Sequence, residues 1–371
     1  MRFMRISFAW ITIIFLSGNL LAQIKGNVGL TGEYDSNAYN DSYGGGTMVG
    51  TAYLDLTTDI DLKLAGMLLG ADYSGSYSAY LSYLGINQND HLLKMILWRE
   101  LGKDGFMGLG AAYGFQLNAA DRSAYDTNNF KIIGETKVYL AQTVLLKTDG
   151  ALGRYQYKNL PQYDFDQSIA NVSLTLFLSS RTGLTVLAGY KKYDFSSLSA
   201  DSQVPEKITN LSPGCRASQG FGSNVGLSLE YSYLTNEVTT ANSYYMPDTL
   251  LSEVNDYFDY SGGRVEAKIT LKLDPVGKLA LWSNYTSRSY TQLNAFSLPA
   301  ADNASILTRQ NLGAARLDQE TIVGIDYTAP LSEGANGMDL GVGVNYVNNS
   351  SNDELYNYKK LLVYAGLNYN F

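Results

Sequence analysis

The feature that most constrains this chain is a two-residue alternation of apolar and polar side chains. In residues 264–272 every even position is polar or charged and every odd position is apolar. Residues 225–233 and 340–346 show the same alternation. A β-strand turns successive side chains to opposite faces, whereas a helix would scatter these apolar residues around its axis. The pattern therefore predicts an all-β chain whose strands separate two different surroundings.

The predicted connections between strands alternate between short and long. Short ones, rich in Gly, Asn and Asp, are expected at 57–61, 102–105, 179–183, 220–224, 274–278 and 332–337. Long polar ones are expected at about 36–46, 74–90, 118–129, 196–205, 236–257, 290–317 and 348–355. Short turns on one side and long loops on the other are typical of outer-membrane barrels.

This rhythm predicts a closed antiparallel up-and-down transmembrane β-barrel of about sixteen strands, with fourteen or eighteen left open. An even count places both termini on the short-turn side. Closure is required because an open sheet edge in lipid would leave backbone amides unpaired. The expected strands are 24–35, 47–57, 62–73, 91–101, 106–117, 130–140, 143–156, 164–178, 184–195, 206–219, 225–235, 258–273, 278–289, 318–329, 338–347 and 356–371.

The N-terminal residues have the pattern of a secretory signal. Arg2 and Arg5 precede an apolar stretch from Ile6 to Leu16, and a small residue, Ala22, offers a cleavage site. The apolar stretch is shorter than the roughly 20 residues of a membrane-spanning helix. We therefore expect a cleaved signal peptide at 1–22 and a barrel domain at 23–371, located in the outer membrane of a Gram-negative-type cell.

Composition narrows the classes of function. The 371 residues include one Cys (Cys215) and one His (His91). Disulfide frameworks, and metal sites built from several Cys or His, are therefore excluded, and no cofactor is expected. The formal net charge of −8 argues against nucleic acid as a partner, because phosphates are bound by basic surfaces.

The last strand carries the clearest resemblance to a known class. Residues 363–371 place apolar and aromatic side chains on one face and end in an aromatic residue; these positions are Val363, Ala365, Leu367, Tyr369 and Phe371. The segment resembles the C-terminal sorting strand of bacterial outer-membrane β-barrel proteins. The resemblance implies that the barrel-assembly machinery reads this strand during biogenesis, and it names a class of proteins rather than a substrate.

If the apolar face touches lipid, the polar face lines the interior. A charge facing lipid at the midplane would cost about 2–4 kcal/mol, whereas a charge facing water inside the barrel stays hydrated. About sixteen strands leave an aqueous lumen rather than a filled core. The candidate pore-lining residues are Arg264, Glu266, Lys268, Lys272, Lys278, Arg288, Glu320, Asp326, Asp339, Lys131, Glu135, Lys137 and Glu230.

Two interpretations of this lining stay open. Basic residues on 258–289 and acidic residues on 318–347 either create a transverse field that selects solutes, or neutralise each other in a bland polar wall. The many Tyr residues near strand ends favour an aromatic girdle at the membrane interface. A carbohydrate-stacking track is the rival interpretation, and its candidates are Tyr139, Tyr155, Tyr364 and Trp282.

The predicted function is a porin-like channel for passive diffusion of small hydrophilic solutes, without enzymatic activity. The alternative is a structural or partner-binding barrel, a sleeve for an export or electron-transfer complex. A rim enzyme using His91 is the weakest reading, because a single His beside polar loop residues is more often solvated than catalytic. The expected partners are outer-membrane lipids and the assembly machinery, with homo-oligomerisation left open.

Overall fold

The computed structural model describes residues 24–37, 40, 45–62, 66–82, 87–195, 206–239, 259–297, 310–332 and 337–371. The expected signal peptide at 1–22 lies outside the described residues. So do the expected loop at 196–205 and the greater part of those at 36–46 and 236–257.

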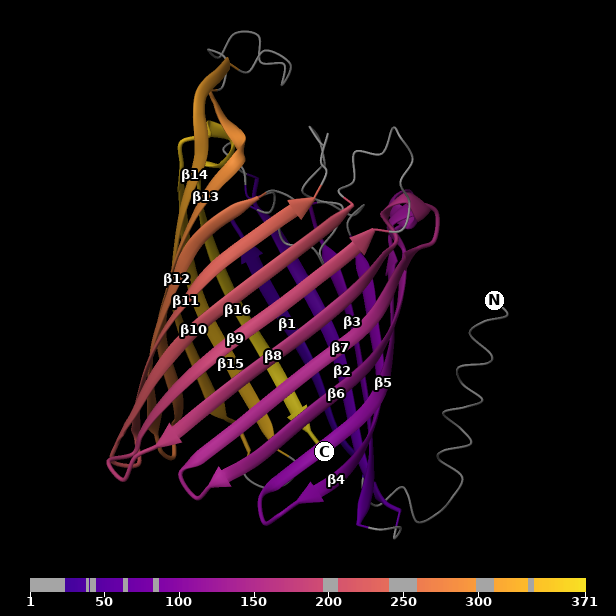
Figure 1. Cartoon of the computed structure of the whole chain (residues 1–371), viewed down its shortest axis with the longest axis vertical. Coiled ribbons are helices and arrows are strands. Elements are labelled where there is room, and N and C mark those ends of the chain that lie inside the picture. Colours follow the sequence, from indigo (N-terminus) through magenta and orange to yellow (C-terminus); the bar gives the residue numbers. More distant parts are fainter. Residues whose placement is uncertain are drawn as a thin grey trace.

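Sixteen antiparallel strands form one closed barrel (Figure 1). Each strand pairs with its neighbours in sequence, and β1 pairs with β16 to close the ring. The strands are β1 (Ile24–Asp35), β2 (Thr47–Asp61), β3 (Met67–Tyr80), β4 (Gln88–Leu101), β5 (Gly105–Asn118), β6 (Thr127–Ala141), β7 (Val144–Tyr157), β8 (Phe165–Phe177), β9 (Thr182–Phe195), β10 (Lys207–Phe221), β11 (Val225–Thr239), β12 (Tyr260–Leu273), β13 (Gly277–Ser297), β14 (Gln310–Pro330), β15 (Met338–Ser351) and β16 (Tyr358–Asn370).

The predicted count of sixteen is confirmed, but three predicted connections, at 57–61, 74–90 and 290–317, are wrong in whole or in large part. The expected turn at 57–61 belongs to β2, which continues to Asp61, and the turn follows instead, with Gly66 at φ +69°. The expected loop at 74–90 is mostly strand, because β3 runs to Tyr80 and β4 begins at Gln88. The serines of this segment are typical of a loop. They are also compatible with a strand whose inward side chains face water.

The long-loop end of the barrel is uneven. β13 and β14 are 21 residues each and rise beyond their neighbours (Figure 1), so most of the expected loop at 290–317 is strand. Short 3₁₀ turns occur at Ala120–Tyr125, Pro161–Tyr163 and Glu354–Tyr356. In the part of the chain that the structure describes, no helix has the length and apolar character needed to span a bilayer.

A carboxylate holds one of these 3₁₀ connections to the barrel. The side chain of Asp164 accepts a 2.8 Å hydrogen bond from the backbone N–H of Tyr157, at the end of β7. Burial raises the pKa of Asp164 above its ordinary value, whereas this hydrogen bond and the guanidinium of Arg154 lower it. The carboxylate thus fixes the path of the chain into β8.

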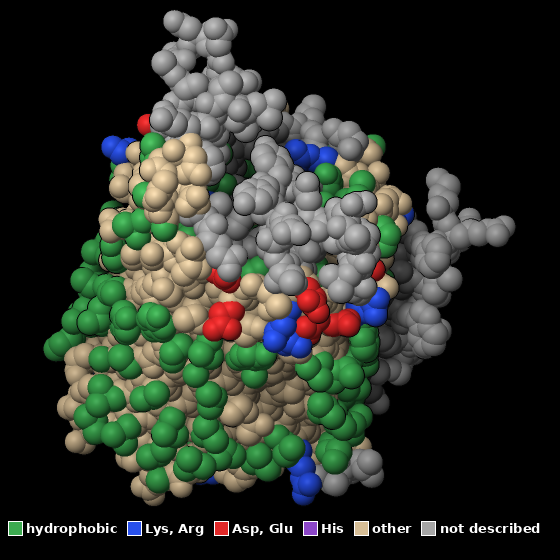
Figure 2. Space-filling model, turned by 45° about the horizontal axis from the view of Figure 1, so that its top comes forward, with side chains coloured by type: hydrophobic (Ala, Val, Ile, Leu, Met, Phe, Trp, Pro, Cys, Tyr) green, Lys and Arg blue, Asp and Glu red, His purple; other side chains and the backbone are tan. Residues whose placement is uncertain are grey.

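The outer face of the barrel is an apolar surface. Side chains such as Leu30, Leu109, Leu152 and Val186 are 62–67% exposed there. Figure 2 shows hydrophobic side chains spread over this wall, with a band of charged side chains nearer the loops. Exposed apolar surface of this extent marks contact with lipid or another apolar partner. It matches the outward apolar band of transmembrane barrels.

The seam between β1 and β16 closes at the chain terminus. Gly26 and Phe371 exchange two backbone hydrogen bonds of 2.9 Å. The Phe371 ring lies against Gly26, in the space that a Cβ on Gly26 would need. A Cβ at position 26 would therefore displace the terminal ring from this strand.

We expect Gly26→Val to destabilise the barrel by about 1–3 kcal/mol, the usual cost of overpacking. The matched control is Gly32→Val, on the same face of β1, where a Cβ meets open space. Thermal unfolding in detergent should show a lower midpoint for Gly26→Val alone. Equal midpoints for the two variants would contradict the packing role of this glycine.

Candidate functional site

A central cavity of about 860 Å³ lies inside the barrel. Its lining comes from all ten consecutive strands from β7 to β16, so the cavity identifies the inward-facing register. The side chains that line it include Lys147, Arg216, Glu230, Glu266, Lys268, Trp282, Asp326, Asn345 and Tyr364.

Strand register extends this assignment around the ring. Residues paired across neighbouring strands share a face, and all thirteen candidate residues fall on the inward register. For example, Lys272 pairs with Lys278, Arg288 with Gly262, and Lys131 with Gly153. Their part in a conducting pore stays a prediction.

Two arginines and two glutamates form a network on β10–β12. Arg216 Nε donates a 2.6 Å hydrogen bond to Glu230, which is buried. Arg264 lies 4.0 Å from Glu230 and 3.2 Å from Glu266. Glu230 and Glu266 are register partners, so two like charges face each other and Arg264 compensates both.

The expected acidic strip on β14 and β15 is engaged by local donors. Asp326 accepts hydrogen bonds from Trp282 Nε1 at 2.7 Å and from the Tyr364 hydroxyl at 2.6 Å. Tyr358 donates to Glu320 at 3.3 Å. Asn370 donates to Asp339 at 3.4 Å. Each of these three carboxylates therefore has a local hydrogen-bond donor.

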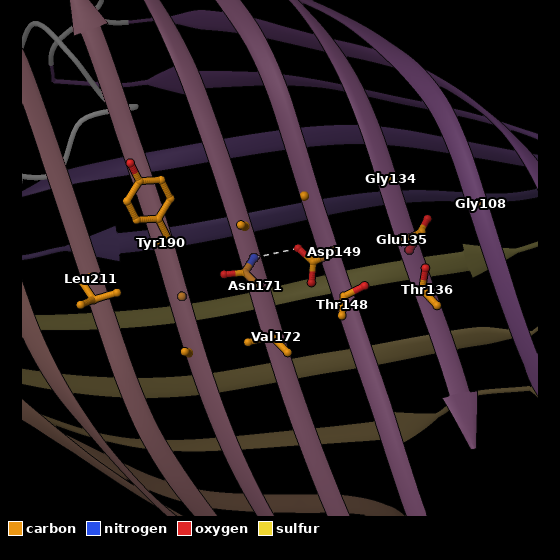
Figure 3. Close-up of a pocket in the computed structure, with 14 residues that line it drawn as sticks. Gly108, Gly134, Glu135, Thr136, Thr148, Asp149, Asn171, Val172, Tyr190 and Leu211 are labelled. Atoms are coloured by element: carbon orange, nitrogen blue, oxygen red, sulfur yellow. Dashed lines mark hydrogen bonds between the residues drawn. The ribbon is translucent and has the colours of Figure 1, made fainter. Parts of the chain in front are cut away.

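The opposite wall, on β3–β8, has its own contacts. Lys94 lies 3.6 Å from Glu135 and 3.9 Å from Asp72. Asn171 donates a 2.7 Å hydrogen bond to Asp149, seen in Figure 3. A second hollow, of about 590 Å³, lies in the wall formed by β5–β10 (Figure 3), and Thr136, Val172, Tyr190 and Leu211 among its lining residues lie on the outward register.

An aromatic cluster at the long-loop end of β7–β10 was not predicted. Phe165 is fully buried, its ring centroid 4.7 Å from Tyr155 and 5.5 Å from Tyr193. The cluster comprises Tyr155, Tyr157, Phe165, Tyr193, Phe195 and Ile208. Tyr155 is stacked on Phe165 and covered by the Lys131 ammonium at 4.8 Å, so it offers no open sugar-stacking face. The cluster could have been predicted from the sequence, because neighbouring strands each carry an aromatic residue at an inward position near the same end.

A buried arginine, Arg316, also lies at the long-loop end of the barrel. Arg316 makes hydrogen bonds of 2.5–3.1 Å to Asp318 and lies over the Tyr356 ring at 3.3 Å from its centroid. Tyr290 is on its other side, at 4.7 Å. This contact fastens the extended β13–β14 pair to the short turn before β16.

The predicted sorting residues share the outer face of β16. Val363, Leu367, Tyr369 and Phe371 are 39–46% exposed, and the rings of Tyr369 and Phe371 stack at 6.1 Å. Recognition of this face by the assembly machinery stays a prediction.

The sole histidine is also on the outer face. His91 Nδ1 lies 2.9 Å from the Tyr73 hydroxyl, and its ring centroid is 4.5 Å from that of Phe115. The described residues contain no group of three or more His, Cys, Asp or Glu suited to hold a metal ion.

Comparison with known proteins finds similarity in fold. No protein-family model matches the chain, and no curated protein sequence does either. OccAB1 of Acinetobacter baumannii superimposes with a TM-score of 0.54 at 10% identity, over 94% of this chain and 97% of that one. OccAB4 of the same organism gives 0.51 at 12% identity, over 94% and 98%. A bacterial polysaccharide outer membrane secretin gives 0.50 at 10% identity, over 93% and 97%. The chain therefore has the fold of outer-membrane β-barrel proteins, and the predicted class resemblance is confirmed.

The contacts of Asp326 can be tested by fluorescence. Trp98→Phe leaves Trp282 as the only tryptophan of residues 23–371. In this background we expect Asp326→Ala to shift Trp282 emission to longer wavelength and to speed its quenching by acrylamide. The free energy of unfolding should fall by about 1 kcal/mol for each hydrogen bond removed. Asp339→Ala, which removes a carboxylate bonded to Asn370, should leave the emission unchanged. An unaltered spectrum in Asp326→Ala would contradict the assigned hydrogen bond.

Proposed function

We propose that this protein is an integral outer-membrane channel, porin-like, through which small hydrophilic solutes diffuse passively. The observation that carries the proposal is the contrast between an apolar, exposed outer face and a charged inner wall around a cavity that ten strands enclose. Export through the signal pattern at 1–22, and insertion by the assembly machinery through the last strand, belong to the same proposal.

The energetics of the two faces support a wet interior. The inner wall contains lysines such as Lys268 and Lys272 that are exposed and make no ion pair with any described residue. An unpaired charge in a dry core would cost several kcal/mol, whereas beside water it costs little. Exposed unpaired lysines inside a barrel therefore favour a hydrated passage over a filled core.

The proposal assigns the barrel no reaction. A rim enzyme would need its histidine beside a nucleophile or carboxylate at the mouth of the barrel. His91 instead lies on the outer face among Tyr73 and Phe115. In the proposed orientation the long loops face the cell exterior and the short turns face the periplasm.

One observation favours a second candidate, a sleeve for a partner. The aromatic cluster fills inner-wall space on β7–β10 at the long-loop end, so the passage is narrower there than the strand number implies. One structural neighbour is described as a polysaccharide outer membrane secretin. A barrel that is silent in planar bilayers and co-purifies with a partner would support the sleeve, whereas stable open-channel steps support the channel.

A bulky side chain on the inner wall should reduce conductance. Gly341 lies on the inward register and Gly50 on the outward register, and a Cβ at either position meets open space. We expect Gly341→Trp to lower the single-channel conductance, because the indole takes cross-section from the water-filled passage. Gly50→Trp should leave it unchanged. Equal conductance in the two variants, or no channel steps from the folded wild type, would count against the channel.

A further inference from the structure

Lysines face lysines at two places on the inner wall. Lys272 on β12 is the register partner of Lys278 on β13, and Lys137 on β6 is the partner of Lys147 on β7. Directly opposed like charges destabilise a sheet. Among the described residues none of the four ammonium groups makes an ion pair, and Lys137 has only the ring of Tyr139 beneath it, at 5.5 Å.

Strands β6 and β7 also carry two directly opposed carboxylates, and both of these are compensated. Glu135 and Asp149 are also register partners. Lys94 lies 3.6 Å from Glu135, and Asn171 donates to Asp149 at 2.7 Å, so each carboxylate has a compensating neighbour. The lysine pairs lack such neighbours, so their positive charge stays available to something that enters the lumen.

Two unpaired lysines border the same cavity. Lys147 and Lys268 both line the 860 Å³ cavity, together with Arg216, whose side chain is half exposed while its Nε is bonded to Glu230. The three carboxylates that line the cavity already accept contacts from Arg216, Arg264, Trp282 and Tyr364. The cavity therefore presents available cations and engaged anions, a charge pattern that attracts anions. Its volume is that of a small-molecule pocket.

We propose that the central cavity is a binding subsite for small organic anions, of the carboxylate or phosphate-monoester class, with Lys147 and Lys268 as its available cations. This inference rests on the proposed function, because the solute reaches the cavity through water. Arg216 contacts Glu230 through both Nε and Nη2, and its Nη1 is the remaining guanidinium nitrogen that can donate to an oxyanion. Lys272 and Lys278, at the short-turn end, give the positive field that leads an anion to or from the cavity.

The test measures binding and conduction separately. Purified barrel in detergent is titrated by calorimetry with succinate, with glycerol 3-phosphate and with neutral glycerol, and the same barrel is recorded in planar bilayers. We expect succinate, glycerol 3-phosphate or both to bind, and glycerol not to bind. The double variant Lys147→Gln/Lys268→Gln should weaken anion binding about tenfold or more, the effect of losing hydrogen bonds to charged groups.

A matched control separates this site from general charge. Lys25→Gln removes one lysine from the inward register of β1, away from the cavity lining. It should leave anion binding unchanged, and β-sheet circular dichroism checks that each variant is folded. Binding of succinate alone assigns the site to carboxylates, and binding of glycerol 3-phosphate alone assigns it to phosphate monoesters.

Conduction without anion binding by the wild type, or equal binding by the wild type and the double variant, would overturn the subsite while leaving the channel standing. A barrel that gives no conductance steps but still binds succinate through Lys147 and Lys268 would contradict the channel and support the anion site.

Discussion

The structure depends on the need of every backbone N–H and C=O to find a partner in an apolar medium. Consecutive strands satisfy this need around most of the ring, and the pairing of β1 with β16 satisfies it at the last gap. The seam runs to the final residue, where Gly26 and Phe371 exchange both hydrogen bonds. Once the ring is closed, register is fixed everywhere, and with it the face on which each side chain lies.

Most of this architecture could be predicted from two patterns. The sixteen strands follow from the rhythm of short and long connections, and the inward placement of the charged residues follows from a period of two, because parity survives small errors in strand ends. The errors occur where alternation loses contrast. The serines of β3 at 74–78 resemble a loop, and the end of β2 at 57–61 resembles a turn, although both segments are regular strand whose polar positions Ser74, Ser76, Thr57 and Asp59 lie on the inward register.

The pattern of neutralisation in the candidate site could not be predicted, since it depends on contacts that skip a strand. Tyr364 on β16 reaches Asp326 on β14 across β15, and Trp282 reaches the same carboxylate from the adjacent β13. Lys94 on β4 reaches Glu135 on β6 across the small side chains of β5. Sequence parity shows that these residues share a wall, but twist and rotamer decide which of them meet. The carboxylates of β14 and β15 thus have local donors, while several lysines of the inner wall make no ion pair with a described residue, and the selectivity of this wall stays a prediction.

The inner wall changes character along the barrel axis. At the long-loop end, buried rings such as Phe165 fill space on β7–β10, and the Arg316–Asp318 pair lies on β14, which with β13 continues beyond its neighbours. In the middle, carboxylates and guanidiniums compensate one another around the cavity. At the short-turn end, Lys272 and Lys278 face each other without a carboxylate among the described residues. Packing at one end thus stabilises the ring without closing the middle. This division lets the barrel tolerate repulsion at the other end, because hydrated lysines there cost little and retain the field that an anionic solute would meet.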